Sequence, residues 1–152
     1  MQSKEEFWTV AEIIADHMPV VIRCHSDEWK SYFDDYTLID AVSIDRGDLL
    51  GIDYKNRVHF KPTWIKDAER TNILVLTRLD QVPVRSDDYT AKTQLDFAHL
   101  IRTKDEDDAC RELGMGTGVF VPRDLRVFIV LPYQYALDQF FFSRCAQIEI
   151  DT

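Results

Sequence analysis

The chain has 152 residues, 45% of them hydrophobic, which is enough to bury one core and predicts a single domain over 1–152. No stretch approaches the roughly 20 apolar residues that a membrane-spanning helix needs. A net charge of −9 argues against a nucleic-acid surface held by phosphate contacts. The 3 cysteines are widely spaced and no secretory signal is visible, so a cytoplasmic location is expected.

The N-terminal third is predicted to alternate helices and strands. Ser3 and Glu6 form a capping box, which predicts a helix over 3–17. Its inner face should carry the apolar residues Phe7, Val10, Ala11, Ile14 and Ala15. A buried strand follows at 20–24, and Ser26 can cap a second helix. That helix would pack through Trp29, Tyr32, Phe33 and Tyr36.

The remaining elements continue this alternation. Strands are expected at 38–44, 58–60, 73–76, 119–121, 126–131 and 147–150, and turns at Gly47, Gly51 and 114–118. Helices are expected near 62–65, over 90–102 and at 137–142. The inner face of the 90–102 helix should carry Leu95, Ala98, Leu100 and Ile101. Strands that alternate with helices predict an α/β three-layer sandwich with a mostly parallel central sheet.

Residues 20–31 have the spacing of a phosphate-binding loop without its glycines. The pattern is G-x-x-x-x-G-K-[ST] after an apolar strand. Lys30 and Ser31 supply the final pair, but Cys24 and Trp29 stand at the two glycine positions. Glycines there let backbone N–H groups curl around phosphate oxygens, and an indole would obstruct that approach. The spacing therefore predicts a degenerate loop, and an ordinary strand, turn and helix is the alternative.

The segment 72–83 resembles the second nucleotide-site motif of AAA+ ATPases, an apolar strand that ends in Asp-Glu. In that family the Asp holds Mg²⁺ and the Glu polarises the attacking water. Thr77 and Arg78 occupy these two positions here, and neither can replace a carboxylate. Asp80 lies two residues further on, outside the chemistry. A buried strand that ends in a polar turn is the alternative.

The segment 126–150 resembles the closing stretch of an AAA+ core, in which Ser-Arg-Cys or Ser-Arg-Phe precedes the last strand. Ser143 and Arg144, followed by a cysteine, match the clamp-loader form of this motif. Segments 121–127 and 62–64 are instead similar to the MoxR-type branch.

Two positions of this stretch bear on function. The family's polar sensor falls near Pro132, which offers no hydrogen-bond donor. Arg144 matches the arginine finger, which such proteins extend to the γ-phosphate of a neighbouring subunit. The alternative for Arg144 is a surface arginine that pairs with Glu149 or Asp151.

The resemblance covers about 10–151 and implies an AAA+-like P-loop NTPase topology, without a helical lid because the chain stops at Thr152. It also implies a protein that is not an enzyme and needs no cofactor or metal, since its own nucleotide motifs are degenerate. Such a pseudo-ATPase would act through protein–protein interaction, as partner, regulator or inhibitor of an AAA+ or other ATPase assembly, or by self-association. The candidate contact residues are Phe140, Phe141, Ser143 and Arg144.

Two other functions stay open. One is weak nucleotide binding that uses Lys30 and Ser31. The other is an acidic inhibitor that occludes a DNA-binding protein, for which the acidic run 105–108 is the densest segment. The 4 histidines have no metal-like spacing, and no His/Asp pattern makes Cys24 or Cys145 a nucleophile. Neither direct nucleic-acid binding nor membrane association is expected.

Overall fold

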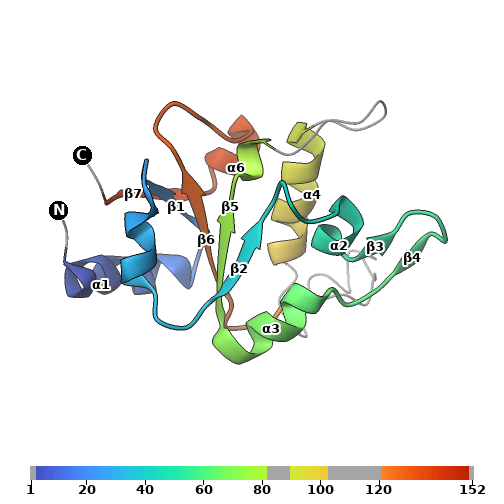
Figure 1. Cartoon of the computed structure of the whole chain (residues 1–152), viewed down its shortest axis with the longest axis horizontal. Coiled ribbons are helices and arrows are strands. Elements are labelled where there is room, and N and C mark those ends of the chain that lie inside the picture. Colours follow the sequence, from blue (N-terminus) through green and yellow to red (C-terminus); the bar gives the residue numbers. More distant parts are fainter. Residues whose placement is uncertain (1–2, 82–89, 103–120, 151–152) are drawn as a thin grey trace.

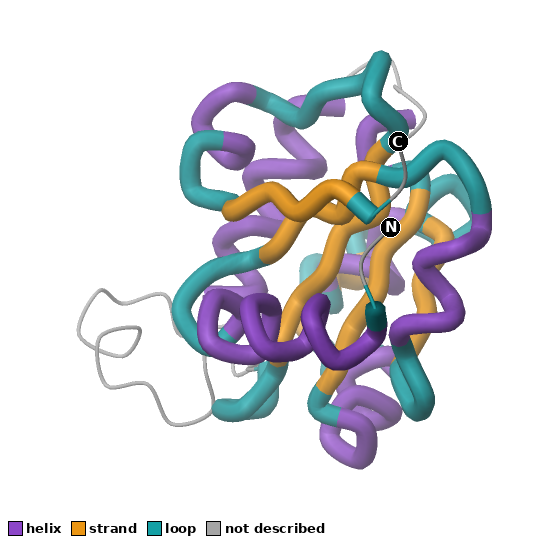
Figure 2. Tube along the Cα trace, turned by 90° about the vertical axis from the view of Figure 1, so that its left-hand side faces the viewer, coloured by secondary structure: helices purple, strands orange, loops and turns teal. Residues whose placement is uncertain are grey.

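The computed structural model describes residues 3–81, 90–102 and 121–150 (Figure 1). Its centre is a 5-stranded sheet in the order β2-β5-β6-β1-β7. The strands are β1 (Val20–Arg23), β2 (Thr37–Asp40), β5 (Ile73–Thr77), β6 (Arg126–Leu131) and β7 (Ala146–Glu149). All four pairings are parallel, which confirms the predicted parallel sheet. Figure 2 shows the strands side by side, with the helix that follows the N-terminus lying across them.

Helices cover both faces of this sheet. On one face lie α2 (Arg46–Leu50), α3 (Thr63–Thr71), α4 (Thr90–Arg102) and α6 (Gln139–Phe142), and on the other α1 (Lys4–Ala15) and the 3-10 helix η1 (Asp27–Tyr32). Neighbouring strand residues alternate between the two cores, as Leu74 and Val75 do, because successive side chains point to opposite faces. Figure 1 shows α1 on one side of the sheet and α2 and α4 on the other. The predicted α/β class with helices on both faces is confirmed.

Helix α1 begins at the predicted cap, where Ser3 Oγ accepts the backbone N–H of Glu6 at 3.1 Å. Phe7, Ala11 and Ala15 are buried as predicted. The prediction for Val10 is wrong, because this side chain is 46% exposed. The buried residues recur every four positions, so the inner face is a narrower stripe than the sequence indicates.

An aromatic cluster joins α1 to η1 and the sheet. Phe7 is fully buried, and its ring centroid lies 5.0 Å from that of Tyr32, 5.8 Å from Phe33 and 6.2 Å from Phe128. Trp8 joins the cluster through an edge contact to Phe33 at 5.3 Å. Aromatic pairs at such separations add to the stabilisation from burial. This cluster forms the core on the α1 face.

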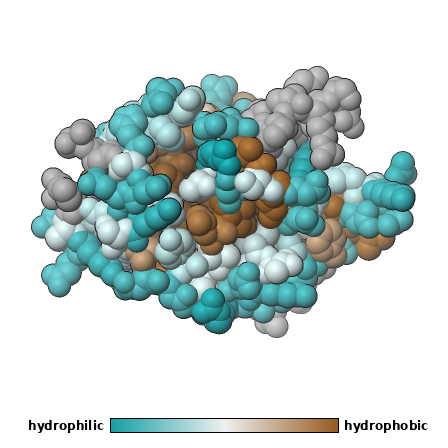
Figure 3. All heavy atoms as spheres, viewed as in Figure 1, coloured by the Kyte–Doolittle hydropathy of each residue, from teal (hydrophilic) through white to brown (hydrophobic). Residues whose placement is uncertain are grey.

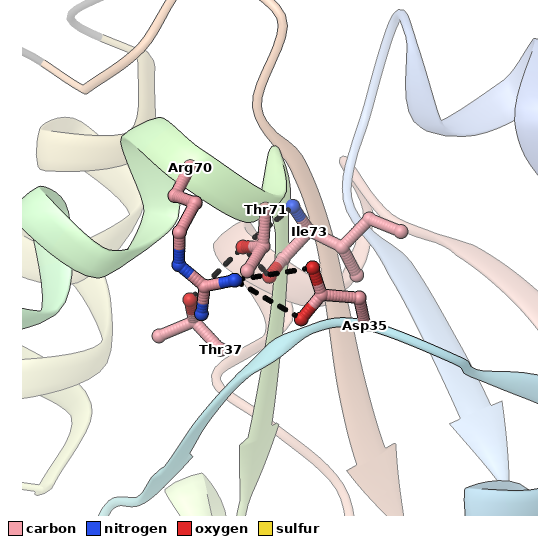
Figure 4. Close-up of polar contacts among 5 residues, drawn as sticks. All are labelled: Asp35, Thr37, Arg70, Thr71 and Ile73. Atoms are coloured by element: carbon pink, nitrogen blue, oxygen red, sulfur yellow. Dashed lines mark hydrogen bonds and ion pairs between the residues drawn. The ribbon is translucent and has the colours of Figure 1, made fainter.

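Polar contacts set the start of the edge strand β2 (Figure 4). The hydroxyl groups of Thr37 and Thr71 lie 3.0 Å apart, and Thr71 Oγ1 donates to the carbonyl of Ile73 at 3.1 Å. Arg70 Nη1 lies 3.2 Å from Asp35 Oδ2. The end of α3 is thereby tied to the segment that enters β2.

Two predicted boundaries between β2 and α3 are wrong. The strand expected over 38–44 ends at Asp40, whose carboxylate accepts the N–H of Val42 at 3.3 Å and the hydroxyl of Ser43 at 2.9 Å. These bonds turn the chain away from the sheet. Gly47 lies inside α2 and not in a turn, and a Cβ there would come within 2.5 Å of the Ile52 carbonyl oxygen. The turn at Gly51 is confirmed, with φ of 73°.

The segment after α2 forms a hairpin of β3 (Ile52–Asp53) and β4 (Val58–His59), which extends away from the body in Figure 1. Figure 3, drawn in the same view as Figure 1, shows apolar side chains in the middle of the molecule, where Figure 1 places the edge strand β2. Leu38 on that strand is 48% exposed. The predicted strand at 58–60 is confirmed for its first two residues.

The predicted bounds of α4 are confirmed, and Ala98, Leu100 and Ile101 are buried, whereas Leu95 is half-buried. The sequence reading missed Phe97, which is fully buried. The predicted turn at 114–118, most of the strand at 119–121 and the acidic run 105–108 lie outside the described residues.

Replacing Phe7 by Ala should lower the free energy of unfolding by about 3–5 kcal/mol, because it removes a fully buried ring from the aromatic cluster. Urea unfolding followed by circular dichroism measures this. Ile13→Ala on the same helix is the control, since Ile13 is 66% exposed and its loss should change stability by less than about 0.5 kcal/mol. Equal effects of the two substitutions would contradict the described packing of α1.

Candidate functional site

A cleft of about 490 Å³ lies at the carboxyl ends of four parallel strands. Its walls come from the last residues of β2 and β5 and from the segments that follow β1, β5 and β6, and include Cys24, Trp29, Lys30, Asp40, Thr77, Arg78 and Pro132. In open α/β sheets, ligands bind outside the carboxyl ends of the strands. This carboxyl-end cleft is therefore the candidate site, and it unites most of the positions assigned to the degenerate nucleotide motifs.

The segment after β1 closes into η1 and does not form an open loop. Ser26 Oγ accepts the N–H of Glu28 at 3.2 Å, which confirms the predicted cap. Trp29 is 2% exposed, and its ring packs against those of Phe33 and Tyr36 at 6.1 and 5.9 Å. The indole is thus part of the core on the α1 face, and it stands at the position of the motif's second glycine.

Lys30 and Ser31 are engaged within η1. Lys30 Nζ lies 3.7 Å from Asp27 Oδ2 and 5.7 Å from the centroid of the Trp29 ring. Ser31 Oγ donates to the carbonyl of Glu28 at 2.8 Å, and Ser31 does not line the cleft. The spacing of the motif is thus present, but its ammonium and hydroxyl groups are turned back onto their own helix.

An ion pair joins the carboxyl ends of β2 and β5. Arg78 has a left-handed backbone with φ of 58°, and its Nε donates to Asp40 Oδ1 at 2.8 Å while its Nη2 contacts Oδ2. The hydrogen bond from Arg78 is the main cause that lowers the pKa of the Asp40 carboxyl, and the same bond raises the pKa of Arg78. Thr77, directly before this arginine, is half-buried. Of the two positions at which AAA+ ATPases carry carboxylates, one is therefore the Arg78 that binds Asp40 and the other is Thr77 beside it.

Arg23, the last residue of β1, was missed by sequence reasoning. It is 9% exposed, and its Nη1 donates to the carbonyls of Pro132 and Tyr135 at 2.9 and 2.7 Å. Its Nε donates to Gln147 Oε1 at 3.0 Å. The guanidinium therefore joins β1 to β7 and to the segment after β6, at the edge of the candidate site. A single arginine at the end of an apolar strand carries no sequence signal of this role.

The C-terminal candidates lie away from this cleft. Arg144 and Ser143 are exposed, and Arg144 lines a second cleft of about 270 Å³ at the amino ends of β1 and β6. Phe140 is 64% exposed, whereas Phe141 is 2% exposed and belongs to the core, so Phe140 is the ring available for contact. No ion pair between Arg144 and Glu149 occurs in the described part of the chain, and residue 151 lies outside it.

The two described cysteines are poor nucleophiles. Burial raises the pKa of the Cys145 thiol to about 12, so its thiolate is scarce at neutral pH. Cys24 is 1% exposed, and its Sγ lies 3.1 Å from the carbonyl oxygen of Ser26. Within residues 3–81, 90–102 and 121–150, no group of three His, Cys, Asp or Glu side chains could hold a metal ion.

No protein-family model matches the sequence, and neither does any curated protein. The resemblance to AAA+ cores therefore depends on the residues and spacings described above. Among the helices of the described ranges, none is both long and apolar enough to cross a lipid bilayer.

Replacing Asp40 by Asn should lower the free energy of unfolding at pH 7, because it removes the carboxylate that Arg78 binds. Since the folded-state pKa of Asp40 lies below its unfolded value of about 4, this stabilisation is complete above pH 4 and is lost as the pH falls through the folded-state pKa. Urea unfolding of both proteins from pH 7 to pH 2.5 should show the difference narrowing below about pH 4.

The control is Asp67→Asn, which changes an exposed carboxylate on α3 by the same atoms. Its difference from the unmodified protein should stay small across the same pH range. A difference for Asp40→Asn that persists unchanged at the lowest pH would contradict the ion pair as the cause.

Proposed function

We propose that this protein is a catalytically inactive AAA+-like protein, which acts by contacting other proteins and does not hydrolyse ATP. The observation that carries the proposal is the pairing of the cations in the carboxyl-end cleft with its own acids. Arg78 forks onto Asp40, and Lys30 faces Asp27. Cations that already hold carboxylates are not available to a triphosphate unless those pairs are broken.

The architecture of the sheet supports the AAA+-like part of the proposal. The five strands are all parallel and lie in the order β2-β5-β6-β1-β7, with helices on both faces, as the resemblance to AAA+ cores implies. Fold alone does not assign an activity, so the site carries the functional part of the argument.

Phosphoryl transfer requires groups that the cleft does not supply. It depends on positioning the triphosphate through backbone N–H groups, on Mg²⁺ held by a carboxylate, and on a residue that orients water. Trp29 stands at the position of the second glycine, and Thr77 and Arg78 stand where the family has the carboxylates. Asp80 does not line the cleft, and burial raises the pKa of its carboxyl. These departures support an inactive subunit.

The contact surface of the proposal lies around α6. Phe140 projects an exposed ring, and the exposed Arg144 guanidinium follows four residues later. Aromatic rings and arginines carry a large share of binding energy at protein interfaces. The partner we propose is an AAA+ or other ATPase assembly, which this protein would join, regulate or block.

The acidic-inhibitor alternative has less support among the described residues. Imitation of DNA requires rows of unneutralised carboxylates. Several acids of the described surface are instead paired with cations, as Asp35 is with Arg70 and Asp16 with Arg126.

ATP or ADP with Mg²⁺ should leave the melting temperature unchanged within about 1 °C, since Lys30 and Arg78 of the carboxyl-end cleft are already paired with acids. Differential scanning fluorimetry at millimolar nucleotide measures this. Binding at a hundredfold excess over Kd would add about 2.7 kcal/mol of stability, which shifts the transition by several degrees. A rise that Lys30→Ala abolishes would contradict the proposal and support nucleotide binding at Lys30 and Ser31.

Arg144→Ala and Phe140→Ser should each weaken capture of an ATPase assembly from native lysate by about tenfold or more, because they remove the proposed contacts. Quantitative mass spectrometry of the captured proteins measures this. Ile13→Ser is the control, since it changes an equally exposed apolar side chain on α1.

Capture that both variants retain at the level of Ile13→Ser would contradict the α6 contact surface. The ATPase rate of the captured assembly separates two roles for Arg144. Stimulation that Arg144→Ala abolishes supports an arginine finger, and unchanged stimulation leaves a scaffold or blocking role.

A further inference from the structure

The second cleft lies at the opposite end of the sheet from the candidate site. It is enclosed by the segment that follows α1, the last turn of α4, the start of β6 and the end of α6, and its volume is about 270 Å³. We call it the amino-end cleft. Its floor is apolar and is formed by Ala98, Ile101, Leu125, Val127 and Phe141.

Two arginines stand at the rim of this floor. Arg102 is the last residue of α4, and Arg144 follows α6. Both residues are exposed, and neither forms an ion pair with another described residue. Within the described ranges, two guanidinium groups without an ion pair therefore stand beside one apolar cleft, in a chain whose net charge is −9.

Asp16 is the one carboxylate among the described residues of the lining, and it is already paired. Asp16 Oδ1 accepts a hydrogen bond from Arg126 Nε at 2.9 Å. Arg126 Nη2 also lies 3.6 Å from Glu12 Oε1. Among the described residues that line the cleft, the charges that remain available to a ligand are therefore those of Arg102 and Arg144.

This combination specifies the chemistry of a ligand. The floor favours an apolar group, while a guanidinium binds a carboxylate through two parallel hydrogen bonds. The volume is slightly below the range of about 300–1,000 Å³ typical of small-molecule pockets, so it suits one large side chain better than a nucleotide. Charge complementarity and size together favour a segment of another protein.

We propose that the amino-end cleft binds a partner segment in which a large apolar side chain lies beside one or more carboxylates. The apolar side chain occupies the floor, and Arg102 and Arg144 bind the flanking acids. This inference rests on the proposed interaction function and adds the chemical class of the partner. It gives Arg144 a ligand that is a peptide carboxylate and not a phosphate.

The test uses the full chain and four short, capped peptides. The first carries a phenylalanine flanked by glutamates, the second replaces the glutamates by glutamines, the third replaces them by lysines, and the fourth replaces the phenylalanine by alanine. Binding is followed by ¹⁵N–¹H NMR up to millimolar peptide. The first peptide should perturb the amides around the cleft, and each of the other three should bind at least about fivefold more weakly.

The protein variants are Arg102→Gln and Arg144→Gln, which keep most of each side chain and remove its charge. Each should weaken binding of the first peptide by about fivefold. Arg57→Gln, an equal charge change on the exposed β3–β4 hairpin, is the control and should bind like the unmodified protein. The inference is overturned if the glutamine peptide binds as well as the glutamate peptide, if Arg57→Gln has the same effect as the rim variants, or if no amide near the cleft responds.

Nucleotide titration of the same samples separates this inference from the proposed function. Selective peptide binding together with tight ATP binding would overturn the inactive-ATPase proposal and leave the amino-end cleft as a peptide site. Absence of both nucleotide binding and peptide selectivity would overturn the inference alone.

Discussion

The parallel pairing of β1 with both β6 and β7 is the constraint on which the rest of this structure depends. Val20, Val21 and Ile22 are fully buried, so the strand is covered on both faces as well as along both edges. Because the neighbours of β1 come from the far end of the chain, this pairing closes the fold. It also brings the residue after β1 and the residues after β6 to one end of the sheet, and Arg144 to the other.

The two ends of the sheet differ in how their charges are satisfied. At the carboxyl ends, each cation described above is held by an acid of the same chain or by backbone carbonyls, as Arg23 is by those of Pro132 and Tyr135. At the amino ends, two guanidinium groups face an apolar floor without a described acid to neutralise them. The first arrangement stabilises the fold, whereas the second leaves interaction energy for a ligand. The end at which open α/β sheets bind ligands is thus the end whose described cations are already paired.

Sequence reasoning located β5 and β6 well, because short runs of apolar, β-branched residues are typical of strands in a sheet covered on both faces. It located polar contacts poorly. The Asp40–Arg78 pair joins residues 38 positions apart, and periodicity carries no information on such partners. The same holds for Phe97, whose burial depends on how α4 packs against neighbouring elements. The motif spacing predicted that Lys30 follows a buried strand, as it does after β1. It did not predict that the ammonium group of Lys30 lies beside Asp27.

The two outer strands of the sheet have a consequence for behaviour at high concentration. Both β2 and β7 are four residues long, and β7 places the exposed Gln147 and Glu149 along its length. A β edge recruits strands from other molecules when it is long, flat and apolar, and short edges with charged side chains discourage this. Although Leu38 leaves one apolar group on the β2 edge, each edge offers few backbone groups to an incoming strand. Short edges of this kind disfavour edge-to-edge addition of further molecules.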